Sequence, residues 1–223
     1  MNNFCQPKPG IPPAAGTVFR EMVSQPGVYW VLNTPFADII GLYSNIAEGP
    51  WFIEGKDIGQ DQKNWLIKTL IAIRKARETG PTKALVIAVH HPPYSSGGHA
   101  PSIGMLNDID DACVQGGIMP HALIAGHAHN YQRYTRFVKS HGKELQIPFV
   151  VAGCGGRGAT AVSKADGSRK DDHTFDKSLQ GYGFLTLTAD AKLLTIKFTQ
   201  VDKTKRKLFD TVKVNLKTNK LVK

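Results

Sequence analysis

Five of the eight histidines fall in two short segments, and each segment directly follows an apolar run. They are His90, His91 and His99 in the first segment, and His127 and His129 in the second. Neutral imidazoles grouped in this way suit divalent transition metals. A lone G-H-x-H pattern is equally well explained by two structural histidines at a strand end. The two segments together favour a metal site.

The apolar runs before the histidines predict two strands that are buried on both faces. The first run is "KALVIAVHH" at 83–91 and the second is "HALIAGH" at 121–127. A helix is expected between them at 103–117, which makes a strand–helix–strand unit with parallel strands. Parallel strands end at the same edge of a sheet, where ligands of α/β folds bind. The histidines should therefore converge there.

The rest of the chain predicts one mixed domain behind an irregular start. Residues 1–26 are interpreted as a loop segment, and the domain covers 27–223. A long helix is expected over 57–80, with Asp57 as its N-cap and Gly80-Pro81 as its end. Beyond residue 130 the pattern changes to strands and turns, with 156–180 as a polar loop. The predicted fold class is therefore α/β, with two packed sheets.

The net charge limits the classes of partner without choosing one. Lys+Arg is 28 and Asp+Glu is 18, so the formal charge is +10, which favours anionic partners. The lysine-rich tail at 201–223 reads as an edge strand with Leu208, Val212, Val214 and Leu216 on the core face. Phe209 is its sole aromatic residue, which disfavours a nucleic-acid surface. No apolar run is long enough to predict a membrane helix, and the first residues do not have the pattern of a signal peptide, so the sequence assigns no compartment.

The two histidine segments resemble those of a known family. "GHAHNYQRY" is similar to the GHxHxYxR block of calcineurin-like metallophosphoesterases, in the purple acid phosphatase branch. "VHHPPYSSGGH" resembles the H-x-P-x-Y block of that branch, with a second histidine nine residues after the first. The likeness spans most of 27–190. It implies a two-sheet β-sandwich flanked by helices.

The resemblance also implies a role for each matching histidine. His90 and His127 would bind one metal ion, and His129 would bind the other. His99 would contact the substrate phosphate and protonate the leaving group. Intact members use two Fe, Zn or Mn ions and a metal-bound hydroxide to hydrolyse phosphoesters, and many are exported.

Three other positions in the two segments receive no part in the implied chemistry. Tyr131 and Arg133 match the family motif and are interpreted as structural supports. His91 stands where the family often has a small polar residue, and it remains unassigned.

The carboxylate-bearing blocks of the family, D-x-H, G-D-x-x-D/Y and G-N-H-D/E, do not precede His90. The letters "DDH" at 171–173 fit D-x-H but lie in the predicted polar loop, and Asp57 and Asp61 fit helix caps. Asp108, Asp110 and Asp111 are interpreted as a solvated helix face. Two cations about 3.5–4 Å apart need a bridging carboxylate. We therefore expect a C-terminal part of the fold, incomplete on its N-terminal side, that binds one ion or none by itself.

Three functions remain open from the sequence. The first is a metal-dependent phosphoester hydrolase that acts on a phosphorylated small molecule or another phosphoester, with this chain supplying the histidine side of the site. The second is a catalytically inactive fragment or interaction module, and the third is a basic nucleic-acid-binding domain. An exposed flank of an incomplete sheet would favour self-association or a complementing N-terminal half.

Overall fold

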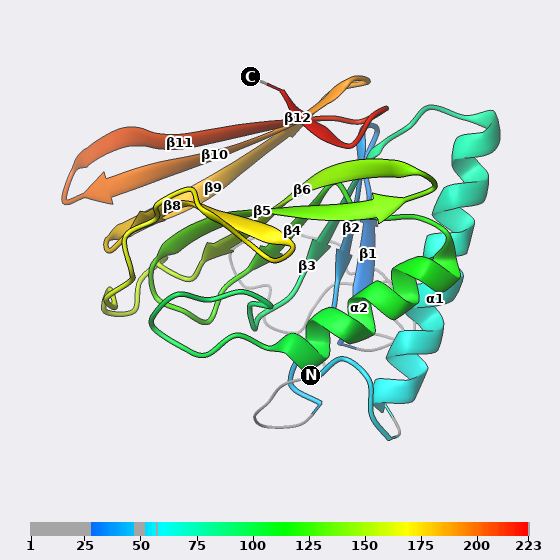
Figure 1. Cartoon of the computed structure of the whole chain (residues 1–223), viewed down its shortest axis with the longest axis horizontal. Helices are drawn as coiled ribbons and strands as arrows, with labels where there is room; N and C mark the ends of the chain where they lie inside the picture. The colour runs from blue at the N-terminus through cyan, green and yellow to red at the C-terminus, as the bar shows by residue number, and fades with distance from the viewer. Residues whose placement is uncertain (1–27, 47–51, 57, 223) are drawn as a thin grey trace, which may run out of the picture.

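The computed structural model describes residues 28–46, 52–56 and 58–222, and these form two packed sheets with helices on one side (Figure 1). The large sheet has the order β1 (Trp30–Asn33), β2 (Ala37–Gly41), β3 (Ala84–Ala88), β4 (Ala122–Ala125), β6 (Lys143–Ala152), β5 (Tyr131–Ser140), β8 (His173–Leu179) and β7 (Arg169–Lys170). The small sheet has the order β12 (Lys220–Val222), β11 (Lys205–Asn215), β10 (Leu193–Asp202) and β9 (Tyr182–Ala189). The predicted α/β class with two sheets is confirmed.

The centre of the large sheet is parallel, because β2, β3, β4 and β6 run in the same direction. Leu85 and Ile87 of β3 pack toward the helices, whereas Val86 packs against the small sheet. All three are fully buried, and burial of each contributes about 1.5–3 kcal/mol. This two-sided burial explains the continuous apolar run, and it confirms the strand–helix–strand unit over 83–127.

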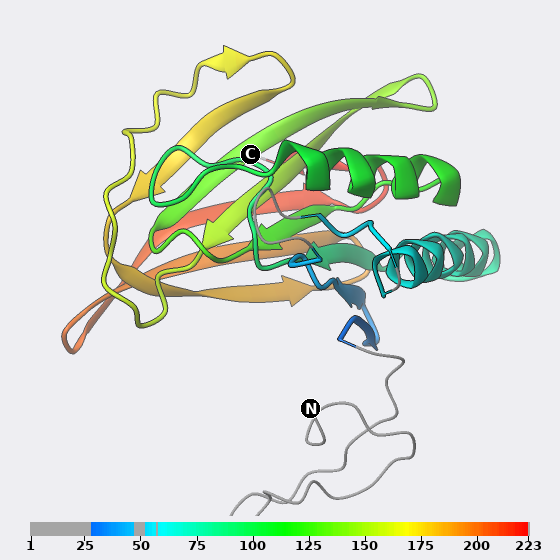
Figure 2. The same cartoon turned by 90° about the horizontal axis from the view of Figure 1, so that it is seen from below.

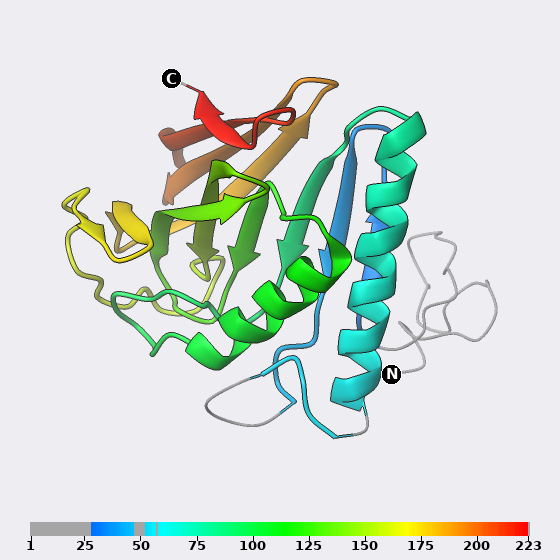
Figure 3. The same ribbon diagram turned by 45° about the vertical axis from the view of Figure 1, so that its right-hand side comes forward.

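Helices α1 (Ile58–Thr79) and α2 (Ile103–Gly116) cover the same face of the large sheet (Figure 3). The backbone N–H of Met105 donates to the Ser102 side chain at the start of α2. Gly117 ends α2 with a φ of 69°, which glycine adopts without a Cβ clash. The expected cap at Asp57 lies outside the described residues. Strand β1, beside α1, forms one edge of the large sheet (Figure 2). Neither described helix has an apolar stretch that could cross a bilayer.

The polar segment at 156–180 was expected to be a loop, but part of it forms β7 and β8. Strand β8 pairs with β5, and its polar side chains are satisfied there. Asp176 accepts hydrogen bonds from Thr135 and Arg133 across the strand pair. Charge pairing therefore replaces the apolar alternation by which a strand is recognised in sequence.

The C-terminal tail forms β11 and β12, with Val212 and Val214 buried as predicted. The predicted edge position is wrong for β11, which pairs with β10 and β12, and β12 is the edge strand of the small sheet. Leu208, by contrast, is 54% exposed, so its predicted core position is wrong. A bulge between Phe198 and Thr199 shifts the register of β10 against β11. As a result Leu208 stands opposite Thr199, whereas Asp210, in phase with Val212 and Val214, occupies the core-facing position beside Phe198.

The interpretation of three α2 aspartates as a solvated face is wrong for two of them. Asp108 is half-buried and accepts N–H groups of Ile53 and Glu54. Asp110 is half-buried, and its Oδ1 accepts a hydrogen bond from the Arg136 Nη1 at 2.6 Å. The partners come from distant segments, residues 53 and 54 before α1 for Asp108 and β5 for Asp110, which local periodicity cannot reveal.

Candidate metal centre

Three histidines meet at the carboxyl ends of two parallel strands. His90 and His91 follow β3, and His127 follows β4 after Gly126. The ring centroids lie 4.8 Å apart for His90 and His91, 5.1 Å for His90 and His127, and 4.4 Å for His91 and His127. One ligand nitrogen from each ring lies within 4.8 Å of the others. We call these three residues the histidine cluster.

The loop after β4 holds His127 in a conformation that non-glycine residues rarely adopt, with a φ of 61°. Gly126 donates its N–H to the carbonyl of His90 at 3.0 Å, which ties the two strand ends together. Gly153 packs against this loop, and a Cβ there would lie 2.2 Å from the Ala128 carbonyl oxygen. A strained residue held by its surroundings is typical of functional sites.

His91 is the cluster member without a role predicted from the sequence. Its side chain is buried, and its Nδ1 lies 2.9 Å from the Ser44 Oγ. The same Oγ accepts the backbone N–H groups of His90 and His91, each at 3.1 Å. Because Ser44 is at Nδ1, Nε2 is the nitrogen that remains for a metal. The sequence contained one signal for this role, because His90 and His91 are adjacent and directly follow the strand. Extended backbone ends at that point, so the two neighbouring side chains can point to the same site.

His99 and His129 lie next to the cluster rather than in it. The ring centroid of His99 lies 4.0 Å from that of His127 and 5.6 Å from that of His129. Among the described residues, the metal-compatible group contains His90 and His127 but not His129. The structure thus places all four predicted site residues at one rim, with His99 between His127 and His129.

Two amides that sequence reasoning overlooked attach the His99 loop to the rim. Asn130 and Gln132 both donate to the carbonyl of Gly97, at 3.2 and 3.1 Å. Gln132 also accepts the backbone N–H of Ser96 at 2.7 Å. Both amides are fully buried, so they fix where His99 stands relative to His127. The sequence signal for this role was the occurrence of polar residues at the start of β5, which is buried.

The cluster is electrically neutral at physiological pH. Burial, together with a smaller effect of the neighbouring imidazoles, lowers the pKa of His91 and of His127 to about 4. Burial, followed by the charges of His129 and His99, also lowers the pKa of His90. A metal binds deprotonated imidazole, so these rings offer lone pairs at pH 7.

The donors at the rim fit one transition-metal ion. A cavity of ≈420 Å³ adjoins the cluster, and its described lining contains no carboxylate: it consists of Val28, Leu42, Tyr43, Ser44, Asn45, His90, His91 and His127. Three imidazoles match the donor set of a mononuclear zinc or related site. A pair of ions needs a bridging negative charge, which the described residues do not bring to this cavity.

The predicted supports, Tyr131 and Arg133, connect the two sheets below the rim. Arg133 donates from Nε to Asp210 at 2.6 Å and from Nη1 to Asp176 at 2.7 Å. The Tyr131 hydroxyl donates to Asp210 at 2.8 Å, and its ring stacks on Phe198. The interpretation as structural supports is confirmed by these contacts.

The "DDH" letters at 171–173 are engaged elsewhere. Asp171 is exposed, and Asp172 accepts hydrogen bonds from Tyr94 and Arg136, each at 2.8 Å. His173 packs its ring against that of Tyr94 at 4.2 Å. The group takes part in packing around β5 and β8 and does not belong to the metal-compatible group of described residues.

Comparisons with known proteins support the fold alone. No protein-family model matches the sequence, and no curated protein matches it. The structure resembles GAP50, the anchor in the inner membrane complex of Plasmodium, with a TM-score of 0.55 and 16% identity over 86% of this chain and 56% of that chain. It also resembles PhoD, with a TM-score of 0.58 and 10% identity over 88% of this chain and 43% of that chain. The chain thus has a phosphoesterase-like fold and spans about half the length of these structures.

Proposed function

We propose that this chain supplies the histidine side of a metal-dependent phosphoester hydrolase. The observation that carries the proposal is the histidine cluster, with three neutral imidazoles within 4.8 Å at the carboxyl edge of a phosphoesterase-like sheet. Ligand sites of α/β sheets form at this edge. The family resemblance of the two histidine segments supports the same chemistry.

His90, His91 and His127 would hold one ion, which supplies Lewis-acid activation of a phosphoryl oxygen and of water when bound. His99 is exposed beside His127, so its imidazole can contact a substrate phosphate. From that position it can donate a proton to the departing alcohol oxygen. The formal charge of +10 attracts phosphorylated substrates toward the protein.

His129 is proposed as a ligand of a second ion on the far side of His99. That ion would need carboxylates, and the described residues bring none to the cavity beside the cluster. A complementing polypeptide that contributes carboxylates would complete the dinuclear centre. The first ion, held by the cluster alone, is expected to support slow turnover, which the carboxylates of such a polypeptide would raise.

The test is hydrolysis of p-nitrophenyl phosphate with added Zn²⁺, Mn²⁺ or Fe²⁺. We expect metal-dependent turnover that falls roughly 100-fold or more in His127→Ala, because the loss removes a metal ligand. His141→Ala is the matched control, since His141 is exposed in the turn between β5 and β6. Turnover that is unchanged in His127→Ala would contradict the proposed site.

A second candidate is a metal-binding module without catalysis. The lack of a carboxylate in the described lining of the cavity favours it, because histidines alone bring no negative charge to offset a second ion. One structural neighbour is described as an anchor, and a likeness in fold does not by itself fix a function. Zinc binding without any turnover, in the same assay, would select this candidate.

A further inference from the structure

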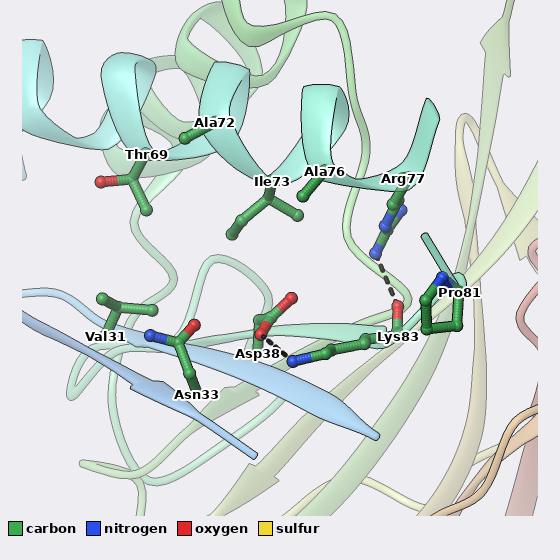
Figure 4. A pocket seen from close by; sticks show the side chains of 10 residues that line it. All are labelled: Val31, Asn33, Asp38, Thr69, Ala72, Ile73, Ala76, Arg77, Pro81 and Lys83. Atoms are coloured by element: carbon green, nitrogen blue, oxygen red, sulfur yellow. Dashed lines mark hydrogen bonds and ion pairs between the residues drawn. The ribbon is translucent and has the colours of Figure 1, made fainter. Parts of the chain in front are cut away.

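A second cavity, of ≈470 Å³, lies between α1 and the first two strands (Figure 4). It is separate from the histidine cluster, because Asp38 in its wall lies near the start of β2 and Ser44 of the metal centre follows the end of that strand. The two cavities share none of their described lining residues. A ligand here would therefore act independently of the proposed hydrolase site.

Small side chains on α1 create the space. Thr69, Ala72 and Ala76 lie three or four residues apart, so they share the face of the helix that lines the cavity. Ile73 on this face and Val31 on β1 add apolar wall. The middle of the cavity is thus lined mainly by carbon, the charged side chains lie toward one end, and Asn33 lines the wall beside Val31.

Arg77, in the last turn of α1, is a cation with few partners. Its Nη2 donates to the carbonyl of Lys83 at 2.7 Å. Its buried Nε has no acceptor among the residues that the structure describes. A guanidinium has five N–H donors, and a buried donor without an acceptor destabilises the fold. Burial also lowers the pKa of Arg77, while Asp38 opposes that effect.

Asp38 and Lys83 complete the polar end. Lys83 donates from Nζ to the carbonyl of Thr34 at 2.8 Å, and that Nζ lies 3.7 Å from the Asp38 Oδ1. Asp38 is buried, and its carboxylate accepts no hydrogen bond within the described part of the chain. Two cations and one anion leave this end with a net charge of one positive unit.

We propose that this cavity binds a small organic monocarboxylate with a short hydrocarbon body. One negative charge balances the polar end, and the terminal guanidinium nitrogens of Arg77, rather than its buried Nε, provide the N–H donors that a carboxylate accepts. The side chains of Val31, Ala72 and Ile73 receive the hydrocarbon part. Asp38 repels a second negative charge, so inorganic phosphate and phosphate monoesters are excluded.

Calorimetric titration of the purified chain with hexanoate tests the proposal, with hexanol and inorganic phosphate as comparison ligands. We expect saturable hexanoate binding, hexanol binding weakened roughly tenfold or more, and no phosphate response that depends on Arg77. Arg77→Met should weaken hexanoate binding roughly tenfold or more. Lys75→Met removes the same charge from an exposed position two residues away and should leave the affinity unchanged.

Two further variants change the affinity in opposite directions. Asp38→Asn should tighten hexanoate binding because it removes a nearby negative charge, whereas Ala72→Phe should abolish binding by filling the space. Ala72→Phe also answers the question if Arg77→Met does not fold. His127→Ala must leave hexanoate affinity unchanged. The proposal is overturned if hexanoate does not bind, if hexanol binds equally well, or if Ala72→Phe binds as the unchanged chain does.

Discussion

One stretch of chain, from the end of β4 into β5, builds two polar regions with opposite properties. The first is the histidine cluster, to which this stretch contributes His127. The second, which we call the arginine network, consists of Arg133 and Arg136 with four carboxylates: Asp110, Asp172, Asp176 and Asp210. Each guanidinium in the network has two carboxylate partners, whereas the cavity beside the cluster has no carboxylate in its described lining.

The charge states follow from this difference. Hydrogen bonds and charges from the carboxylates overcome desolvation and raise the pKa of Arg133 and of Arg136. In the cluster, burial acts without any opposing anion and lowers the pKa of all three imidazoles. The network is complete within the fold, so its role is to hold β5 against β8, β11 and α2. The neutral imidazoles of the cluster are the donors through which we propose that it binds a metal ion.

Removing an anion from the network should produce the largest loss of stability. Asp210→Ala leaves Arg133 buried with one of its two carboxylates and removes the acceptor of the Tyr131 hydroxyl. We expect the free energy of unfolding to fall by about 3–5 kcal/mol in urea titrations. His127→Ala in metal-free protein should change it by less than about 1 kcal/mol. Equal losses in the two variants would contradict the division between structure and binding.

Acid should weaken the fold through histidine before it affects the network. His121 accepts the Leu85 N–H at 2.8 Å, and burial lowers its pKa to about 4. The unfolded value is about 6.5, so the unfolded chain binds more protons between these two pH values. Stability should therefore fall as the pH drops from about 6.5 to about 4, by on the order of 3 kcal/mol from His121. The lowered pKa values of the cluster histidines also make the fold less stable as the pH drops.

Urea midpoints measured across this pH range provide the check. His121→Gln keeps a donor and an acceptor but does not titrate, so its stability should depend less steeply on pH. The pKa of Asp172 in the network is lowered by hydrogen bonds from His173 and Arg136, which outweigh desolvation, so its contribution is lost at lower pH. An identical slope in His121→Gln and in the unchanged chain would refute the assignment to His121.

Zinc affinity should distinguish the members of the cluster from their neighbours. His91→Ala should weaken zinc binding roughly 100-fold, since it removes a donor nitrogen from the group of three. His129→Ala should change it by less than roughly threefold, because His129 lies outside that group. Competition with a chromogenic chelator measures both variants. The opposite order would place the first ion between His99 and His129.

A smaller effect is expected from the residue that orients His91. Ser44→Ala removes the Oγ that contacts the His91 Nδ1 and accepts two backbone N–H groups. Loss of a group that orients a metal ligand commonly weakens affinity 10- to 100-fold, and we expect roughly tenfold here. The same chelator competition is the readout. An unchanged affinity would show that packing alone holds His91 in place.

Sequence patterns predicted those parts of the fold in which local rules and tertiary burial agree. The continuous apolar runs at 83–91 and 121–127 identified β3 and β4, and their parallel pairing follows from the intervening helix. Strand β8 was not predicted because polar side chains, which form ion pairs and hydrogen bonds, stand where a typical strand has apolar ones. The predicted core position of Leu208 was wrong because a bulge interrupts the pairing of β10 with β11. Such a bulge depends on both strands and cannot be recognised from the sequence of either strand alone.

The sequence predicted at which edge of the sheet the site lies, but not which residues form it. His90, His99, His127 and His129 were expected there and do lie along one rim, yet which of them share an ion depends on side-chain directions. His91 gained its place through Ser44, which is 47 residues away in sequence. The network carboxylates were similarly hidden, because Asp110 and Asp210 resemble surface residues until Arg136 and Arg133 are seen beside them.

The measurement that tests the central claim most directly is the number of zinc ions bound per purified chain, determined by elemental analysis after equilibrium dialysis. The unchanged chain should hold about one ion, from the single group of three imidazoles. The double variant His90→Ala/His127→Ala should hold almost none, and His141→Ala should match the unchanged chain. No bound zinc in the unchanged chain, or equal zinc in the double variant, would contradict the assignment of the histidine cluster as a metal centre.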